Sequence, residues 1–162
     1  MRLALYQPDI PQNTGAIVRL CACLGVPLDI IEPCGFTFTD KTLRRVAMDY
    51  ADIAEVKRHT SWQAYQEQRE GRLVLLTTQA RLSYVDFRFA RGDRLLLGRE
   101  SAGAPEEVHA AADARVCVPL LPAARSLNVA IAAGMVLGEA LRQTAGFPIG
   151  GGLESIGGKH ER

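Results

Sequence analysis

The sequence has no apolar segment of transmembrane length. Its longest apolar stretch, residues 127–137, is interrupted by Asn128 and Gly134, and it is about half of the roughly 20 residues that a membrane-spanning helix needs. Pro8 breaks the opening segment before a signal-peptide core is complete. These absences predict no membrane partner and a cytoplasmic location.

The sequence also has little excess charge of either sign. Its 19 Lys and Arg residues nearly balance 18 Asp and Glu residues, for a formal net charge of +1. This balance disfavours a free-standing polyelectrolyte binder, so a nucleic-acid partner requires a local basic patch or an oligomer that concentrates one. Hydrophobic residues make up 48% of the 162 residues, which excludes disorder for most of the chain and suits one folded domain.

Cysteine and histidine patterns typical of metal or redox sites are missing. Among the four cysteines, Cys21 and Cys23 form a C-x-C pair rather than a C-x-x-C motif. The three histidines, His59, His109 and His160, are isolated, so we expect no metal site. We expect reduced thiols and all four cysteines buried as small hydrophobic residues.

Three common catalytic motifs are absent as well. No G-x-G-x-x-G follows the first predicted strand, which argues against dinucleotide binding and against a Rossmann-type methyltransferase. There is no P-loop sequence for nucleoside triphosphates and no G-x-S-x-G nucleophile elbow.

Short apolar runs alternate with helical patterns along the chain. The predicted strands are residues 3–6, 28–31, 56–59, 73–76, 95–97 and 116–118. The predicted helices are residues 16–24 after an Asn13 cap, a second capped by Asp40, a third capped by Ser61, and a last one at about residues 126–144. Because the strands are continuously apolar, the pattern predicts an α/β fold with a mostly parallel sheet covered by helices on both faces.

Unusual residues follow three of these strands, where ligands bind in open α/β sheets. They are Thr77 and Thr78, the glycine-flanked loop 98–103, and the segments 119–122 and 125–128. Glycine lets a ligand approach the backbone, whose N–H groups can then bind it. Each feature alone has an ordinary structural explanation, such as a turn for Gly98, a solvated acid for Glu100 or a helix cap for Ser126. Only the combination of these features after three strands is a specific sign of a functional site.

Three segments carry a resemblance to a known family: Asn13-Thr14-Gly15 with Arg19, residues 97–103, and Val118-Pro119 with Ser126-Leu127-Asn128. They resemble the three motifs of the SPOUT RNA 2′-O-methyltransferases. Residues 5–15, 30–36 and 40–50 resemble, more narrowly, the members that methylate the wobble nucleotide of tRNA. The resemblance covers about residues 1–146, and we expect the glycine-rich residues 147–162 to form a disordered tail.

The resemblance implies a fold, a cofactor and an assembly. The C-terminal part of the chain would be threaded through a loop to form a trefoil knot. S-adenosylmethionine (AdoMet) would bind in the knot and leave as S-adenosylhomocysteine. The enzyme would be a homodimer whose sites are completed near the subunit interface by residues 13–19, and it would methylate cytidine or modified uridine in a tRNA anticodon stem-loop.

The resemblance also assigns site residues. The cofactor-binding residues would be Leu76, Thr77, Thr78, Gly98, Glu100, Gly103, Val118, Pro119, Leu120, Ser126 and Leu127. The catalytic residues would be Asn13, Arg19, Glu100, Ser126 and Asn128. A guanidinium stays protonated in proteins, so we expect Arg19 to orient the ribose 2′-OH and to stabilise the developing alkoxide rather than to act as the base.

Basic residues near the site are expected to contact RNA. They are Lys41, Arg44 and Arg45 on the second predicted helix together with Arg125; Lys57 and Arg58 are further candidates, and each alternatively forms part of a solvated face. The chain departs from the family in Arg99, where a proline is common, and in the loss of a second asparagine after Asn128.

Two other functions stay open from the sequence. One is a non-catalytic RNA-binding or assembly module on the same fold, which the intact set of Arg19, Glu100 and Ser126 disfavours. The other is a 2′-O-methyltransferase for another position in tRNA or rRNA.

Overall fold

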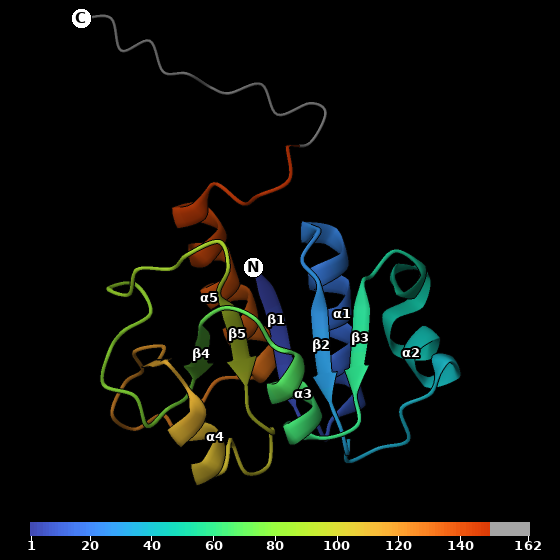
Figure 1. The fold of residues 1–162 in the computed structure, drawn as a ribbon, viewed down its shortest axis with the longest axis horizontal. Helices are drawn as coiled ribbons and strands as arrows, with labels where there is room; N and C mark the ends of the chain where they lie inside the picture. Colours follow the sequence, from blue (N-terminus) through green and yellow to red (C-terminus); the bar gives the residue numbers. More distant parts are fainter. Residues whose placement is uncertain (150–162) are drawn as a thin grey trace, which may run out of the picture.

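A single parallel sheet forms the centre of the computed structural model, which describes residues 1–149 (Figure 1). The strands are β1 Arg2–Tyr6, β2 Leu28–Ile31, β3 Val56–His59, β4 Leu73–Leu76, β5 Arg94–Leu97 and β6 Ala114–Val116. Their order across the six-stranded sheet is β3-β2-β1-β5-β4-β6, and each adjacent pair is parallel. The predicted α/β class is confirmed, although the last strand begins and ends two residues earlier than predicted.

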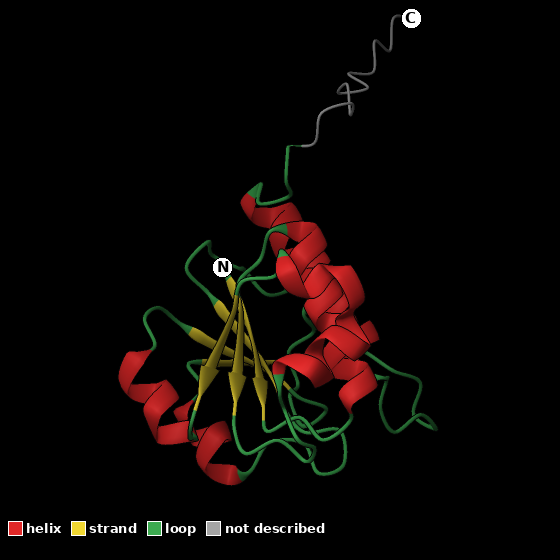
Figure 2. Ribbon diagram, turned by 90° about the vertical axis from the view of Figure 1, so that its right-hand side faces the viewer, coloured by secondary structure: helices red, strands yellow, loops and turns green. Residues whose placement is uncertain are grey.

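Helices cover both faces of this sheet, as the edge-on view in Figure 2 shows. They are α1 Pro11–Leu24, α2 Asp40–Ala47, the 3₁₀ helix η1 Met48–Asp52, α3 Trp62–Gln68, α4 Glu106–Ala111 and α5 Val129–Thr144. The sequence pattern does not predict the short helix α4, because its six residues span too few turns to show a clear period.

The side chains of β1 show how the two layers are held. Leu3 and Leu5 pack with α1 and α5 in one core cluster, whereas Ala4 and Tyr6 pack with α3 and α4 in the other. Alternation along a strand sends successive side chains to opposite faces, so a strand buried on both faces is apolar throughout. This is why the strands read as continuous apolar runs in the sequence.

Two helix starts differ from the sequence prediction. Helix α1 begins at Pro11 with Ile10 as the cap residue, so Asn13 lies inside the first turn and does not cap the helix. Proline is favoured in a first turn because its missing N–H has no partner there anyway. Helix α2 is capped by Thr39, whose hydroxyl accepts a hydrogen bond from the Thr42 N–H at 3.1 Å.

The starts of the third and last predicted helices lie at or close to the predicted residues. Ser61 caps α3 as predicted. Asn128 caps α5, so this helix begins at Val129, three residues after the predicted start at Ser126.

Helix α1 is not covered on every side within one copy of the chain. Gln12, Ala16, Arg19 and Cys23 are exposed or partly exposed, and their spacing of about one turn puts them on one stripe. The expectation that all four cysteines are buried is therefore wrong, because Cys23 is exposed and Cys34 and Cys117 are only partly buried. The hydrophobic pattern identifies an apolar helix, but it does not show that one face has no partner in the same chain.

The structure covers the first three of the residues expected to form a tail, which belong to no helix or strand. Residues 150–162, the rest of that expected tail, lie outside the described residues. None of the helices in residues 1–149 is long and apolar enough to cross a membrane. The trefoil knot implied by the resemblance stays a prediction.

Candidate functional site

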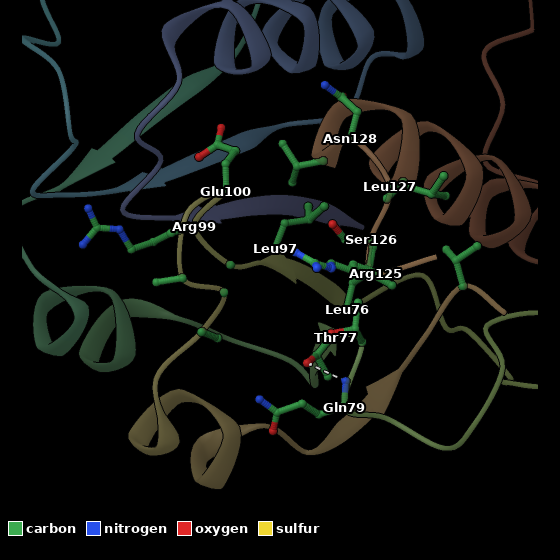
Figure 3. A pocket seen from close by; sticks show the side chains of 18 of the residues that line it. Leu76, Thr77, Gln79, Leu97, Arg99, Glu100, Arg125, Ser126, Leu127 and Asn128 are labelled. Carbon is green, nitrogen blue, oxygen red and sulfur yellow. Dashed lines mark hydrogen bonds between the residues drawn. The ribbon is translucent and has the colours of Figure 1, made fainter. Parts of the chain in front are cut away.

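A cavity of about 580 Å³ opens beyond the carboxyl ends of β4 and β5 (Figure 3). Its walls come from the segments that follow β4, β5 and β6 and from the start of α5. Of the eleven residues predicted to bind the cofactor, ten line this cavity and Pro119 does not: the ten are Leu76, Thr77, Thr78, Gly98, Glu100, Gly103, Val118, Leu120, Ser126 and Leu127. The fold thus brings together residues that are far apart in the sequence.

The loop after β5 is a tight turn that requires glycine. The Arg99 N–H donates to the Gly103 carbonyl at 3.1 Å, and the Gly103 N–H donates back to the Arg99 carbonyl at 2.9 Å. A Cβ on Gly98 would lie 2.6 Å from the Ala104 nitrogen, and Gly103 has a φ of +67°. Both positions therefore need glycine, one for close backbone approach and one for its left-handed conformation.

Glu100 in this turn is held by the β1–α1 segment. Its carboxylate accepts hydrogen bonds from the Asp9 N–H at 2.9 Å and from the Asn13 amide at 3.4 Å. The Asn13 carbonyl oxygen in turn accepts a hydrogen bond from the Asn128 amide at 2.9 Å. Three of the predicted catalytic residues therefore form one connected network at the cavity.

Asp9 belongs to this network but is not among the predicted site residues. Its carboxylate accepts a hydrogen bond from the Ser101 hydroxyl and lies 3.8 Å from the Arg99 Nε atom. A hydrogen bond with Glu100 lowers the pKa of Asp9, whereas burial, followed by the contact with Asp9, raises the pKa of Glu100. The two neighbouring carboxyl groups are thus pushed apart in acidity, as expected for like charges in a shared site.

The other two predicted catalytic residues lie in different surroundings. Ser126 lines the cavity, whereas Arg19 does not. Arg19 is exposed further along α1, where its guanidinium lies 4.6 Å from the centre of the Tyr50 ring in η1. Within one chain, therefore, the arginine is separate from the cavity that contains Asn13.

The predicted RNA-binding residues also divide into two groups. Arg125 lines the cavity. Lys41, Arg44 and Arg45 lie on α2, which packs against α1 at the β3 side of the sheet (Figure 1). Arg44 pairs with Asp52 at 2.7 Å. The further candidates Lys57 and Arg58 lie on β3, and Arg58 pairs with Glu32 at 2.5 Å.

Several cavity residues are not predicted from the sequence. They are Ile10, Gln79, Ala104, His109, Val129 and Ala132, whereas Leu97, Arg99 and Ala102 belong to the expected motif 97–103 without being named as cofactor-binding residues. The position of Gln79 directly after the Thr77-Thr78 pair is a usable signal. His109 gives none, because the helix that positions it is not predicted. Residues 1–149 contain no group of three His, Cys, Asp or Glu side chains arranged to hold a metal ion.

Known proteins that resemble this chain in sequence are RNA methyltransferases. Residues 1–138 match the SpoU rRNA Methylase family. A relative from Beijerinckia indica, named tRNA (cytidine(34)-2′-O)-methyltransferase, is 61% identical over 144 residues, which cover 87% of this chain and 90% of the relative.

Two solved structures share the fold. One, from work on the 2-OH methylation of C/U34 on tRNA, has a TM-score of 0.82 and 40% identity, and the alignment covers 88% of this chain and 94% of that chain. The other is the SpoU methyltransferase AviRb from Streptomyces viridochromogenes in complex with the cofactor AdoMet. It has a TM-score of 0.78 and 26% identity over 88% of this chain and 60% of that chain. The family match, which spans most of the sequence, together with these relatives shows that the chain belongs to the SpoU rRNA methylase family.

Proposed function

We propose that this protein uses AdoMet to methylate the ribose 2′-OH of nucleotide 34, the wobble position of tRNA, when that nucleotide is cytidine or a modified uridine, and that it does so in the cytoplasm. The observation that carries the proposal is the 61% identity to a relative named for this reaction, extending over nearly the whole of both chains. The convergence of Asn13, Glu100 and Asn128 at one cavity supports a catalytic role over a purely RNA-binding one.

The cavity suits a cofactor of the size and polarity of AdoMet. Its volume of about 580 Å³ lies within the usual range of about 300–1,000 Å³ for small-molecule sites. Apolar walls from Leu76, Leu97 and Val118 suit a flat base, and the glycine turn at Gly98 and Gly103 lets a ligand approach the backbone closely. The related AviRb structure contains AdoMet, which supports the same cofactor here.

Bound AdoMet would supply an electrophilic methyl group on a positively charged sulfur, so the protein mainly has to position and activate the hydroxyl. In our proposal Arg19 holds the 2′-OH and a neighbouring phosphate and stabilises the negative charge that develops on the oxygen, while the hydroxyl proton passes to that phosphate or to water. Glu100, held by Asn13 and the Asp9 N–H, fixes the turn that shapes the cavity. Asn128 joins this network to the first turn of α5, and Ser126 borders the cavity beside it.

We further propose that the active unit is a homodimer formed through α1 and α5. Ile131 and Met135, one turn apart on α5, are 58% and 40% exposed, and the exposed stripe on α1 contains Ala16 and Cys23. These two helices pack against each other, so their apolar exposed residues lie on one layer of the molecule (Figure 2). Arg19 belongs to the same stripe, so a second copy packed there would bring it towards a cavity that it does not reach within one chain.

The RNA interface in this proposal includes α2. Lys41 and Arg45 are exposed on this helix, and Arg19 stacks on Tyr50 immediately beyond it. A basic surface that leads from α2 towards Arg19 suits the phosphates of an anticodon stem-loop. The unstacked bases of such a loop are accessible to contacts with protein side chains. Arg125 extends positive charge to the cavity.

The deciding experiment incubates the protein with methyl-labelled AdoMet and bulk tRNA, and then maps the label by nuclease digestion and mass spectrometry. We expect label only on the ribose of nucleotide 34. A synthetic anticodon stem-loop with a 2′-deoxyribose at position 34 is the matched control, and we expect it to accept no label because it lacks the reacting hydroxyl.

Other outcomes identify the alternatives. Label at another tRNA nucleotide, or in rRNA supplied in parallel, would overturn the proposed substrate and retain the methyltransferase. Absence of label from every RNA, with AdoMet binding detected by calorimetry, would support the RNA-binding module instead.

A further inference from the structure

His109 is a buried histidine whose ring nitrogens make no hydrogen bond with any residue in the range 1–149. Its exposed fraction is 4%. A neutral imidazole carries one donor and one acceptor, and leaving buried polar atoms unpaired is costly. Such a group in a folded protein needs an explanation. The other buried histidine of residues 1–149, His59, has one: its Nε2 atom lies 3.0 Å from the Asp29 carboxylate.

The position of His109 supplies that explanation. The residue lies on α4 and lines the cavity together with apolar residues such as Leu97 and Ala104. Helix α4 and Gln79 lie at the opposite side of the cavity from Glu100 and Asn128 (Figure 3). His109 is a cavity-lining residue of α4, and this helix lies across the cavity from Glu100 and Asn128.

We propose that His109 hydrogen-bonds the purine base of bound AdoMet and thereby selects adenine, an inference that rests on the proposed function. Under the proposed function the transferred methyl group lies towards Asn13 and Glu100, the proposed catalytic residues that line one side of the cavity. The base then extends towards α4.

A neutral imidazole suits that base. Adenine offers ring nitrogens as acceptors and an exocyclic amine as a donor, whereas the carboxylate and ammonium of the methionine portion are charged and favour solvated or ionic partners. The proton of a neutral imidazole can sit on either ring nitrogen, so His109 can present a donor or an acceptor to the ligand without moving the helix.

The test measures binding of S-adenosylhomocysteine by titration calorimetry rather than turnover. Wild type is compared with His109→Leu, which fills similar space without polar atoms, and with His109→Gln, which restores an amide donor and acceptor. Glu106→Gln, an exposed change on the same helix, is the matched control. Each protein is also titrated with the inosine analogue and with the 1-, 3- and 7-deaza analogues of the ligand, which alter one edge of the base at a time.

We expect His109→Leu to bind S-adenosylhomocysteine about tenfold more weakly, the usual effect of one lost hydrogen bond. His109→Gln should recover part of the affinity, and Glu106→Gln should match wild type. Wild type should bind at least one altered-base analogue about tenfold more weakly than S-adenosylhomocysteine, and His109→Leu should remove that difference. The leucine variant should melt at the same or a higher temperature without ligand, because it removes unpaired buried nitrogens.

Two results would overturn the inference. One is equal affinity of wild type and His109→Leu for S-adenosylhomocysteine. The other is an analogue preference in wild type that persists unchanged in the leucine variant or, if that variant does not fold, in His109→Phe, whose side chain also has no hydrogen-bonding atom. Failure of wild type to bind S-adenosylhomocysteine at all would instead refute the cofactor assignment, and the inference with it, so the two failures are distinguishable.

Discussion

The side chains of Asn13 and Asn128, 115 residues apart, form a hydrogen bond of 2.9 Å in which the Asn128 amide is the donor. The same Asn128 side chain uses its oxygen to cap α5, accepting from the Ala130 N–H at 2.9 Å. One residue therefore begins a helix and joins that helix to the network around Glu100. Its two functions use different atoms, so they can be separated by mutation.

Substitution of Asn128 separates the cap from the network. Asn128→Asp keeps the capping oxygen and loses the amide donor, so we expect stability near that of wild type and a clear loss of kcat. Asn128→Ala loses both and should also reduce the free energy of unfolding by about 1 kcal/mol. Thermal unfolding and steady-state kinetics check both variants. Equal kcat in wild type and Asn128→Asp would contradict a function for the Asn13 contact.

Gly98→Ala should damage the cavity. A Cβ there would lie 2.6 Å from backbone atoms of Gly103 and Ala104, so the turn must shift. We expect a loss of about 1–3 kcal/mol in stability, as for other overpacked sites, and at least tenfold weaker binding of S-adenosylhomocysteine. Gly92→Ala, in the turn before β5, is the control, because a Cβ on this glycine meets nothing within 4 Å, and it should be neutral or stabilising. Wild-type affinity in Gly98→Ala would show that the turn is not part of the cofactor site.

Asp29 gives the protein a predictable response to acid. Burial would raise the pKa of this carboxyl, but hydrogen bonds from Arg2 and His59 outweigh burial and lower it. Arg94 also pairs with it, at 3.0 Å. A depressed pKa contributes stability above the unfolded-state value of about 4, and this contribution is lost as the pH falls through the folded-state pKa.

Asp29→Asn tests that contribution. The variant leaves the partly buried guanidinium groups of Arg2 and Arg94 without their shared carboxylate, so we expect a loss of about 3 kcal/mol near neutral pH. The difference in unfolding free energy between wild type and variant should shrink as the pH is lowered below about 4. Urea unfolding followed by circular dichroism across this pH range measures it. A difference that stays constant with pH would contradict the depressed pKa.

Arg19→Ala should separate binding from catalysis. The side chain is exposed and does not line the cavity of its own chain, so affinity for S-adenosylhomocysteine and melting temperature should stay close to wild type. Turnover should be abolished, because the ribose oxygen loses the charge that stabilises it. Arg19→Lys distinguishes the mechanisms: full activity with a shifted pH optimum would favour arginine as the base instead. Kinetics over a pH series, with calorimetry on the same preparations, provide both measurements.

Reversal of charge on α2 should weaken RNA binding without affecting the cofactor. We expect Lys41→Glu and Arg45→Glu each to raise the Kd for the anticodon stem-loop and to reduce its salt dependence. Arg115→Glu, an exposed arginine on β6 at the other edge of the sheet, carries the same charge change and should have little effect. Filter binding over a range of salt concentrations measures these changes. Equal weakening by Arg115→Glu would indicate a general charge effect rather than an interface on α2.

The strands, the α/β class and most of the cavity residues follow from local patterns in the amino-acid sequence. Buried parallel strands must be apolar on both faces, as Leu3 and Ala4 show, and close backbone turns require glycine, as at Gly98. Because these requirements are local, they leave a local signature. The segment around Gly98 and the residues from Ser126 to Asn128 are therefore recognisable from the sequence alone.

Which of these residues meet is a property of the tertiary structure. The bond between Asn13 and Asn128, the position of Asp9 against Glu100, and the unpaired ring of His109 depend on how distant segments cross, and residue spacing along the chain does not encode this. The exposure of Arg19 on α1 has the same origin. An apolar helix pattern shows that a helix buries its surface, but whether its partner is the same chain or another one is decided only in the folded molecule.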